Sequence, residues 1–237
     1  MTLMVRTPVD LSLYLVTDTR MCAPRGVAAT VAEAVAGGVT AVQLRDPLAG
    51  TRELLDLGEQ VLRVLAGTGV PLLVNDRADV AHALGVGVHV GQDDLPPERA
   101  RDLLGPDACI GLSVHEPRQL EAALALPPGT IDYLGVGPIF AQQTKTNAAP
   151  PVGLDTLAAI TSRAVKGSLP CVAIGGIGVD NAAAVRAAGV DGIAVVSAIC
   201  AQPDPGAAAR RLRTAMGRRA ATGPGNPTDH EAQQEVR

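Results

Sequence analysis

Eight short apolar runs, each followed by a helix-like segment, constrain the fold of this chain more than any other feature of its sequence. The segments between the runs are rich in Ala, Leu, Glu and Arg at helical spacing. Eight β-then-α units in one chain predict an α/β fold, a (β/α)8 TIM barrel. A doubly wound open sheet is the structural alternative, but it normally needs fewer strands per domain. The runs occupy residues 11–18, 41–46, 71–76, 87–94, 109–113, 133–140, 170–176 and 192–197.

The barrel is expected to occupy most of the chain. A last helix-like segment begins at Pro205, and we predict a single barrel domain over residues 1–217. Residues 218–237 are polar and rich in Gly and Pro, which predicts a disordered tail. The first ten residues lack the apolar region of a signal peptide, and no apolar run approaches the roughly 18 residues of a membrane span.

Composition narrows the choice of partners. Apolar residues make up 47% of the chain and aromatic residues 1%, which predicts a core of Val, Leu, Ile and Ala between parallel strands and helices. The scarcity of aromatic side chains argues against base stacking, and a net charge of −4 gives no basic surface for a polyanion. We therefore expect small-molecule substrates, no nucleic acid and no membrane. The oligomeric state stays open, a homo-oligomer included.

Cysteine usage indicates a cytoplasmic protein. The chain has four cysteines, widely spaced and without a C-x-x-C pair. We interpret them as reduced residues in or beside the core. They are Cys22, Cys109, Cys171 and Cys200.

Polar or glycine residues follow every apolar run, where a barrel places its chemistry. Asp76 and Asp94 end the third and fourth runs, and adjacent parallel strands lie ~4.8 Å apart. Two carboxylates without a His or Cys partner favour Mg²⁺, which takes its other ligands from water and phosphate. The alternative is that each carboxylate caps the helix that follows it. The full set is Asp18, Gln43, Arg45, Asn75, Asp76, Gln92, Asp93, Asp94, Ser113, His115, Gly137, Thr144, Lys145, Gly175, Gly176 and Ser197.

Two further patterns predict anion binding. Gln43 and Arg45 alternate with apolar residues, so both point to one side of their strand, and Arg45 can fork onto phosphate oxygens or pair with a carboxylate at the rim. The last two turns, with Gly175, Gly176 and Ser197, match the frequent phosphate site of barrels, although tight-turn geometry alone would also explain the glycines.

The loop after the sixth run and the histidines give weaker indications of function. The loop after the sixth run is long and polar, as a mobile lid would be, and Lys145 within it is either a diphosphate ligand or a solvated lysine. His115 and His89 are lone histidines and are predicted to be structural, His89 as a packing residue inside its strand. We find no Ser-His-Asp arrangement and no nucleophile elbow in the sequence.

Taken together, the motifs resemble those of the thiamine-phosphate synthase family of (β/α)8 barrels. The resemblance runs from about Leu11 to Pro203 and rests on "YLVTD", "VQLRD", "VNDRAD", "VHVGQDDLP", "GLSVH", "LGVGPIF…TK", "AIGGI" and "VVSAI", in this order. It implies a transferase of thiamine biosynthesis. Such an enzyme joins 4-amino-5-hydroxymethyl-2-methylpyrimidine diphosphate to 4-methyl-5-(2-phosphoethyl)thiazole, with Mg²⁺ assisting the departure of diphosphate.

The resemblance also implies roles for single residues. Pyrimidine diphosphate contacts fall on Gln43, Arg45 and Asn75, and Mg²⁺ ligands on Asp76 and Asp94. Diphosphate contacts fall on Ser113 and Lys145, and thiazole phosphate contacts on Gly176, Val196 and Ser197, with Gln142 and Thr144 in the lid. Of these, Arg45, Ser113 and Lys145 are implied to be catalytic.

The sequence departs from the family pattern at two positions and leaves two other functions open. Pro47 stands where the family often has a lysine, and Gln142 stands where it often has a threonine. One alternative function is a thiazole tautomerase of the same barrel family, which would use His115 and no Mg²⁺. The other is a barrel without activity that binds the thiazole phosphate as a regulator or sensor.

Overall fold

The computed structural model of the chain, which describes residues 9–23, 25–141 and 150–217, contains a closed barrel of eight parallel strands. Each strand pairs with the next in the sequence, and β8 pairs with β1 to close the ring, with Tyr14 opposite Ala194. The predicted (β/α)8 barrel is therefore confirmed, and the open sheet is wrong. The strands are β1 (Leu13–Val16), β2 (Ala41–Leu44), β3 (Leu72–Asn75), β4 (Gly87–Val90), β5 (Ile110–Val114), β6 (Tyr133–Val136), β7 (Cys171–Ile174) and β8 (Gly192–Val195).

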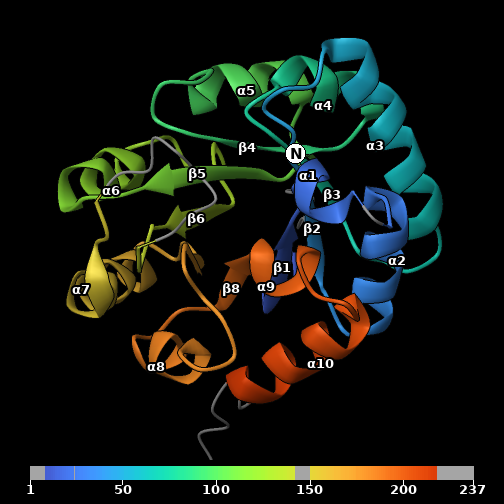
Figure 1. Cartoon of the computed structure of the whole chain (residues 1–237). Coiled ribbons are helices and arrows are strands. Elements are labelled where there is room, and N and C mark those ends of the chain that lie inside the picture. Colours follow the sequence, from blue (N-terminus) through green and yellow to red (C-terminus); the bar gives the residue numbers. More distant parts are fainter. Residues whose placement is uncertain (1–8, 24, 142–149, 218–237) are drawn as a thin grey trace, which may run out of the picture.

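Helices surround the barrel (Figure 1). In that view α1 and α9, the short helices that directly follow β1 and β8, lie near the middle of the molecule over the strands. The helices are α1 (Thr19–Cys22), α2 (Val27–Ala36), α3 (Thr51–Leu65), α4 (Ala78–Leu84), α5 (Pro97–Leu104), α6 (Pro117–Leu124), α7 (Gly153–Lys166), α8 (Ala182–Ala187), α9 (Ser197–Cys200) and α10 (Pro205–Met216).

Local sequence explains where the outer helices begin and which face they bury. Proline occupies the first position of α5 and of α10, where its missing N–H costs nothing. Asp204 caps α10 by accepting a hydrogen bond of 2.7 Å from the amide of Ala207. In α3 the buried residues recur at helical spacing and end at Leu65, so one stripe of this helix faces the strands.

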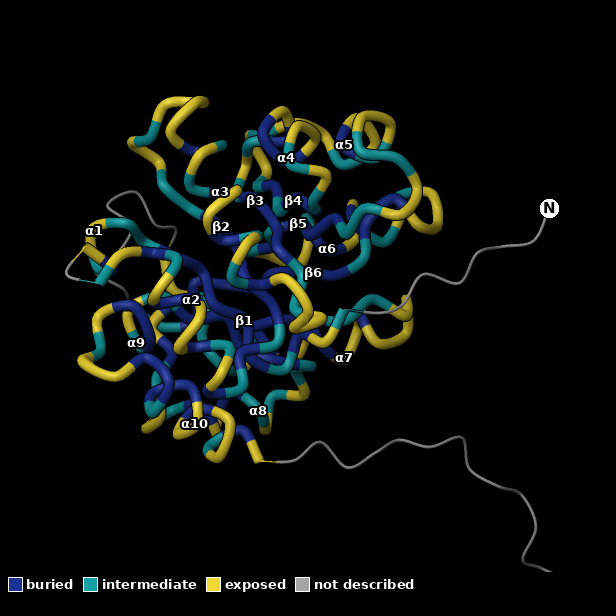
Figure 2. The backbone as a smooth tube through the Cα atoms, turned by 90° about the vertical axis from the view of Figure 1, so that its right-hand side faces the viewer, coloured by how far each residue is buried: buried dark blue, intermediate teal, exposed yellow. Residues whose placement is uncertain are grey.

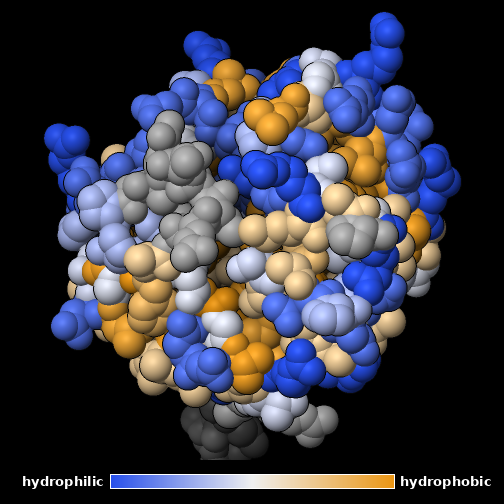
Figure 3. Space-filling model, viewed as in Figure 1, coloured by the Kyte–Doolittle hydropathy of each residue, from blue (hydrophilic) through white to orange (hydrophobic). Residues whose placement is uncertain are grey.

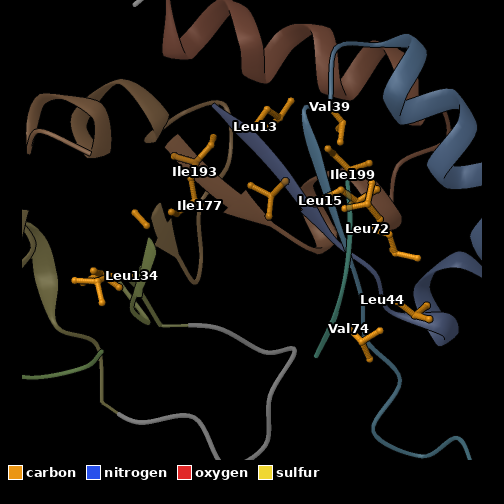
Figure 4. Packing of buried hydrophobic residues seen from close by; sticks show 14 of the residues in the cluster. Leu13, Leu15, Val39, Leu44, Leu72, Val74, Leu134, Ile177, Ile193 and Ile199 are labelled. Carbon is orange, nitrogen blue, oxygen red and sulfur yellow. The ribbon is translucent and has the colours of Figure 1, made fainter. Parts of the chain in front are cut away.

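Most residues of the strands are buried (Figure 2). Outward-pointing side chains such as Leu13, Leu15 and Ile193 pack between the strands and the helices (Figure 4). This layer has the predicted Val, Leu, Ile and Ala composition. The inward-pointing layer differs, because Tyr14 and Tyr133 occupy the barrel interior among small and aliphatic residues.

A partly buried ion pair holds the loops at the amino-terminal end of the barrel. Arg101 of α5 contacts Asp132, just before β6, with an N–O distance of 2.8 Å. Asp132 also accepts the amide of Ile110 at 2.7 Å, and Arg101 donates to the carbonyl of Ala108 at 2.6 Å. These bonds tie α5, β5 and β6 together at the end of a barrel that usually serves stability.

Three of the sequence-based expectations concern the cysteines, membrane spans and the C-terminal tail. The four cysteines have free thiols, three of them buried and Cys109 partly so. Among the helices that the structure describes, none has the length and apolar character needed to cross a membrane. The predicted tail, residues 218–237, lies outside the described residues.

The ring of helices closes through a tight contact between α2 and α10. A methyl group at Gly37, the C-cap of α2, would collide with the carbonyl oxygen of Gly206 in α10. We predict that Gly37→Ala lowers the free energy of unfolding by about 1–3 kcal/mol, because the backbone of α10 must move. Urea denaturation measures this change. Gly178→Ala is the matched control, since a methyl group there meets no atom within 4 Å, and equal losses in both variants would contradict the prediction.

Candidate active site

A cavity of about 710 Å³ lies at the carboxyl ends of the strands, and we call it the mouth cavity. Figure 3 shows the molecule from the side of Figure 1, with hydrophilic residues over much of the periphery of that face. Every strand contributes to the cavity wall. It is lined by Tyr14, Val16, Gln43, Arg45, Pro47, Asn75, Asp76, His89, Gly91, Gln92, Asp93, Asp94, Ser113, His115, Gln119, Tyr133, Gly135, Gly137, Pro138, Val172, Ile174, Ala194 and Val196.

Most of the predicted site residues meet in the mouth cavity. Gly176 and Ser197 do not line it and are exposed on the turns after β7 and β8. The predicted lid residues Gln142, Thr144 and Lys145 lie outside the described residues. The predicted residues that line the cavity are Gln43, Arg45, Asn75, Asp76, Asp94, Ser113 and Val196.

Arg45 presents a positive charge to the cavity from the end of β2. Its backbone amide donates to the hydroxyl of Thr17 at 2.9 Å, which fixes the strand end against β1. Within the described part of the chain its guanidinium forms no ion pair, in contrast to Arg77, which pairs with Asp79. A carboxylate partner at the rim, the alternative considered for Arg45, is therefore not seen there, and the guanidinium can face a bound anion.

Pro47 lies two residues beyond Arg45, is exposed and also lines the mouth cavity. It cannot supply positive charge. The wall of the mouth cavity therefore has no cation at this position.

Asp76 is held in an unusual backbone conformation. Its φ angle is 61°, in the left-handed region that non-glycine residues seldom occupy. The amide of Arg77 donates to the carbonyl of Asn75 at 2.7 Å across it, forming a tight three-residue turn, and the amide of Asp76 donates to the carbonyl of His89 at 2.8 Å. Strain of this kind clusters at functional sites. The N-cap of α4 is Arg77, so Asp76 does not cap that helix.

Asp94 closes the turn that follows β4. Its Oδ2 accepts a hydrogen bond of 2.7 Å from the amide of Gly91. The N-cap of α5 is Pro96 and no side chain caps that helix, so the capping alternative is wrong for Asp94 as well. The sequence reasoning missed this bond within the loop, which depends on the shape of the turn.

The two carboxylates suit a cation that brings ligands of its own. In the described ranges no three His, Cys, Asp or Glu side chains gather closely enough to hold a metal ion. Asp76 and Asp94 do line one cavity from neighbouring strand ends. A pair of carboxylates with no nitrogen or sulfur ligand fits Mg²⁺, which keeps several waters and binds phosphate oxygens.

Ser113 is tied to the barrel interior by a chain of hydrogen bonds. Its hydroxyl lies 2.9 Å from Nε2 of His89, and Nδ1 of His89 lies 2.8 Å from the hydroxyl of Tyr133. The hydroxyl of Tyr133 lies 3.0 Å from that of Tyr14, which accepts a bond of 2.9 Å from Nε2 of Gln43. His89 does pack inside the barrel, against Gly111 and Gly135, as the sequence analysis expected, but its ring also lines the cavity and both of its nitrogens are hydrogen-bonded, which the sequence analysis did not foresee.

Burial keeps both phenols of this chain protonated. It raises the pKa of both tyrosines well above the ordinary value. At Tyr14 the hydrogen bonds of Tyr133 and Gln43 oppose the rise in pKa, whereas at Tyr133 the neighbouring groups add to it. Each phenol therefore carries one hydrogen to donate.

His115 is anchored at the edge of the mouth cavity. Its Nδ1 contacts the carbonyl oxygen of Gly137, which only accepts, so the ring donates from Nδ1. Its backbone amide donates to Oε1 of Gln119 at 2.7 Å. These bonds are those of a fixed residue, in line with the structural role expected from the sequence, although the ring also borders the cavity.

The turn after β7 allows close approach to its backbone. Gly175 and Gly176 have φ angles of 104° and 67°. A methyl group on Gly176 would lie 2.8 Å from Cβ of Phe140, so the turn packs directly on the loop after β6. Asn181 steadies it by accepting the amide of Gly178 and donating to the carbonyl of Gly176, both at 2.9 Å.

A second cavity, of about 630 Å³, lies at the opposite end of the barrel. Leu11, Cys109 and Pro170, which precede β1, β5 and β7, are among the residues that line it. None of the site residues predicted from the sequence reaches it.

A barrel mouth that brings together an arginine, two carboxylates and a serine belongs to the class of (β/α)8 barrels built to handle phosphorylated small molecules. Residues 13–199 match the family model of thiamine monophosphate synthase. The chain belongs to this family.

Relatives of known name agree with this assignment along nearly the whole barrel. The chain is 52% identical over 208 residues to a thiamine-phosphate synthase of Azorhizobium caulinodans, covering 87% of this chain and 95% of the relative. It is 46% identical to one of Desulfitobacterium hafniense, covering 86% and 96%. The solved structure of a thiamine phosphate pyrophosphorylase from Pyrococcus furiosus superposes with a TM-score of 0.76 at 38% identity, covering 88% of this chain and 96% of that one.

The left-handed conformation of Asp76 predicts an order of stability among its variants. The free energy of unfolding of Asp76→Gly should be about 1–2 kcal/mol higher than that of Asp76→Ala, because glycine has no Cβ to clash in this conformation. Asp76→Asn should fall close to the parent, since asparagine tolerates the same region. Urea denaturation of the three variants measures the order. An alanine variant as stable as the glycine variant would show that the backbone at position 76 is not left-handed in solution.

Proposed function

We propose that this protein is a thiamine-phosphate synthase that joins 4-amino-5-hydroxymethyl-2-methylpyrimidine diphosphate to 4-methyl-5-(2-phosphoethyl)thiazole and releases diphosphate. Membership of the family supports the reaction. The observation that carries the proposal is the meeting of Arg45, the Asp76–Asp94 pair and Ser113 in one cavity. Four free thiols fit an enzyme of the cytoplasm.

Within this proposal the interior side of the cavity holds the pyrimidine. Gln43 is buried, and because its Nε2 donates to Tyr14, its Oε1 is the atom left to accept from an amino group on the ring. Asn75, on the neighbouring strand, adds a second amide at the same wall.

The cation site lies next to the departing group. Asp76 and Asp94 would hold Mg²⁺, which when bound neutralises negative charge on diphosphate oxygens. Arg45 provides a second positive charge from β2, and Ser113 a hydroxyl from β5. We propose Lys145 as a further diphosphate ligand and Gly176, Val196 and Ser197, with Gln142 and Thr144, as the thiazole phosphate site.

The chemistry then needs charge stabilisation but no protein nucleophile. The amino-substituted pyrimidine is electron-rich, so the C–O bond to diphosphate can break with its electron pair leaving on the diphosphate. Arg45 and Ser113 interact more strongly with that group as its charge grows, which lowers the barrier. The thiazole nitrogen forms the new C–N bond with its lone pair. The protein has to orient both substrates and exclude water.

Two other functions remain outcomes of the same test. A thiazole tautomerase would depend on His115, which does border the cavity, and would need no metal ion. A regulator would bind thiazole phosphate without turnover, an idea motivated by Pro47 and Gln142.

We predict that the purified protein forms thiamine phosphate from the two substrates only when Mg²⁺ is present, and that EDTA abolishes the reaction. Asp76→Asn should lower kcat by about 100-fold, because it keeps the backbone conformation but removes the charge that faces the cation. Chromatographic detection of thiamine phosphate and diphosphate measures the reaction. Arg211→Ala, on the outer helix α10, is the control and should leave the rate unchanged.

The same assay separates the alternatives. Isomerisation of a thiazole carboxylate phosphate that persists in EDTA and is lost in His115→Ala would indicate the tautomerase. Binding of the thiazole phosphate without any product would indicate the regulator. Either result would overturn the synthase.

The missing cation at the cavity wall gives a prediction of its own. Pro47→Lys should lower the KM for the pyrimidine diphosphate by about threefold or more, because an added ammonium can reach its phosphate oxygens. The KM for the thiazole phosphate should not change. Steady-state kinetics with one substrate varied at a time measures both, and a higher KM for the diphosphate would show that position 47 does not face it.

A further inference from the structure

Five polar side chains form one continuous hydrogen-bonded path across the barrel interior, which we call the polar chain. It links the amide of Gln43 at one wall of the mouth cavity to the hydroxyl of Ser113 at another, through three residues from three other strands. Its two tyrosines belong to the inward-pointing layer of the barrel. Its members in order are Gln43, Tyr14, Tyr133, His89 and Ser113.

Packing holds the middle of the polar chain in place. A methyl group on Gly111 would overlap both the ring of Tyr133 and Nδ1 of His89, and one on Gly135 would lie 2.8 Å from Cε1 of His89. The two tyrosine rings meet edge to face with centroids 6.0 Å apart. The glycines leave a slot that the imidazole fills, so the ring has little freedom to turn.

The donor and acceptor at each link follow from the first one. Gln43 donates from Nε2 to Tyr14, so the hydrogen of Tyr14 goes to Tyr133, its other partner in the polar chain. Tyr133 has then accepted once, and its own hydrogen goes to Nδ1 of His89. A neutral imidazole that accepts at Nδ1 carries its hydrogen on Nε2.

The last link sets the role of Ser113. Nε2–H of His89 donates to the hydroxyl oxygen of Ser113 at 2.9 Å. The hydrogen of that hydroxyl cannot point back along the same bond, so it is directed elsewhere, and Ser113 lines the mouth cavity. A hydroxyl that presents its hydrogen suits an anion, which only accepts.

We propose that His89 is a positioning residue, held as the Nε2–H tautomer by Tyr14 and Tyr133, that fixes Ser113 as a hydrogen-bond donor to an anionic ligand. The inference rests on the proposed function where it takes that ligand to be the substrate diphosphate. The polar chain also joins the two ends of the substrate. With Gln43 accepting at Oε1 and Ser113 donating, it selects a ligand with a hydrogen-bond donor at one end and an anion at the other.

Nitrogen NMR of the ligand-free protein with labelled histidines tests the tautomer directly. The chain has four histidines, and His89→Gln identifies the signals of His89 by their loss. We expect one pyrrole-type nitrogen, assigned to Nε2, and one imine-type nitrogen, assigned to Nδ1. In Tyr133→Phe the imine-type signal of Nδ1 should shift, because its donor is gone. His82→Gln, an exposed histidine of α4, should leave both signals in place.

Kinetics then test the effect on Ser113. Tyr133→Phe should lower kcat/KM for the pyrimidine diphosphate by about three- to tenfold, the range for one lost hydrogen bond. The KM for the thiazole phosphate should stay the same, which general damage to the barrel would not allow. Should Tyr133→Phe fail to fold, a comparison of His89→Gln with His89→Leu provides a second test. Glutamine keeps an N–H for Ser113 and should retain more activity than leucine.

Three results would overturn the inference. The first is a hydrogen on Nδ1 of His89 in the parent protein, which would mean that the hydrogen bonds of the polar chain run in the opposite direction. The second is a doubly protonated imidazole ring. The third is a Tyr133→Phe variant whose signals and rates are unchanged. A protein with the expected tautomer but no synthase activity would instead overturn the proposed function. In that case calorimetry with Mg²⁺ and inorganic pyrophosphate decides, since the inference requires weaker binding in His89→Leu than in His89→Gln.

Discussion

In the short strands of this closed barrel, successive side chains point alternately inward and outward, and this alternation determines where the core and the site lie. Each strand has four or five residues, so each contributes only a few side chains to the barrel interior. The outer face of the strands is apolar and packs against the helices, whereas the inner face combines small and aliphatic residues with Tyr14, Tyr133 and the polar residues above them. The site is therefore a continuation of the barrel interior toward the carboxyl ends of the strands.

The charged groups at the mouth are held in three different ways. Other arginines of the described chain, such as Arg101 and Arg163, have carboxylate partners, while Arg45 forms no ion pair there. Asp76 occupies a backbone conformation that costs stability, and Asp94 uses one of its oxygens to shape its turn. For Arg45 this arrangement suits a ligand that brings the compensating negative charge.

The sequence predicted most of this arrangement, for reasons that can be stated. Apolar runs located all eight strands because buried parallel strands are continuous in their hydrophobicity. The position of Arg45, Asp76 and Ser113 after such runs placed them at the mouth. Sequence could not show how side chains pair across the ring, because that depends on register and closure. The hydrogen bonds of His89 were therefore not predicted, and the capping interpretation of Asp94 failed because of the shape of one loop.

The Arg101–Asp132 pair at the far end of the barrel has a bearing on how the protein can change. It secures three elements and neither of its residues lines the mouth cavity, so this contribution to stability is separate from the site. Substitutions that reshape the mouth for a new ligand can then be tolerated as long as the Arg101–Asp132 pair and its hydrogen bonds stay intact. Stabilising the amino-terminal end of the barrel first would widen the range of mouth sequences that laboratory evolution can explore.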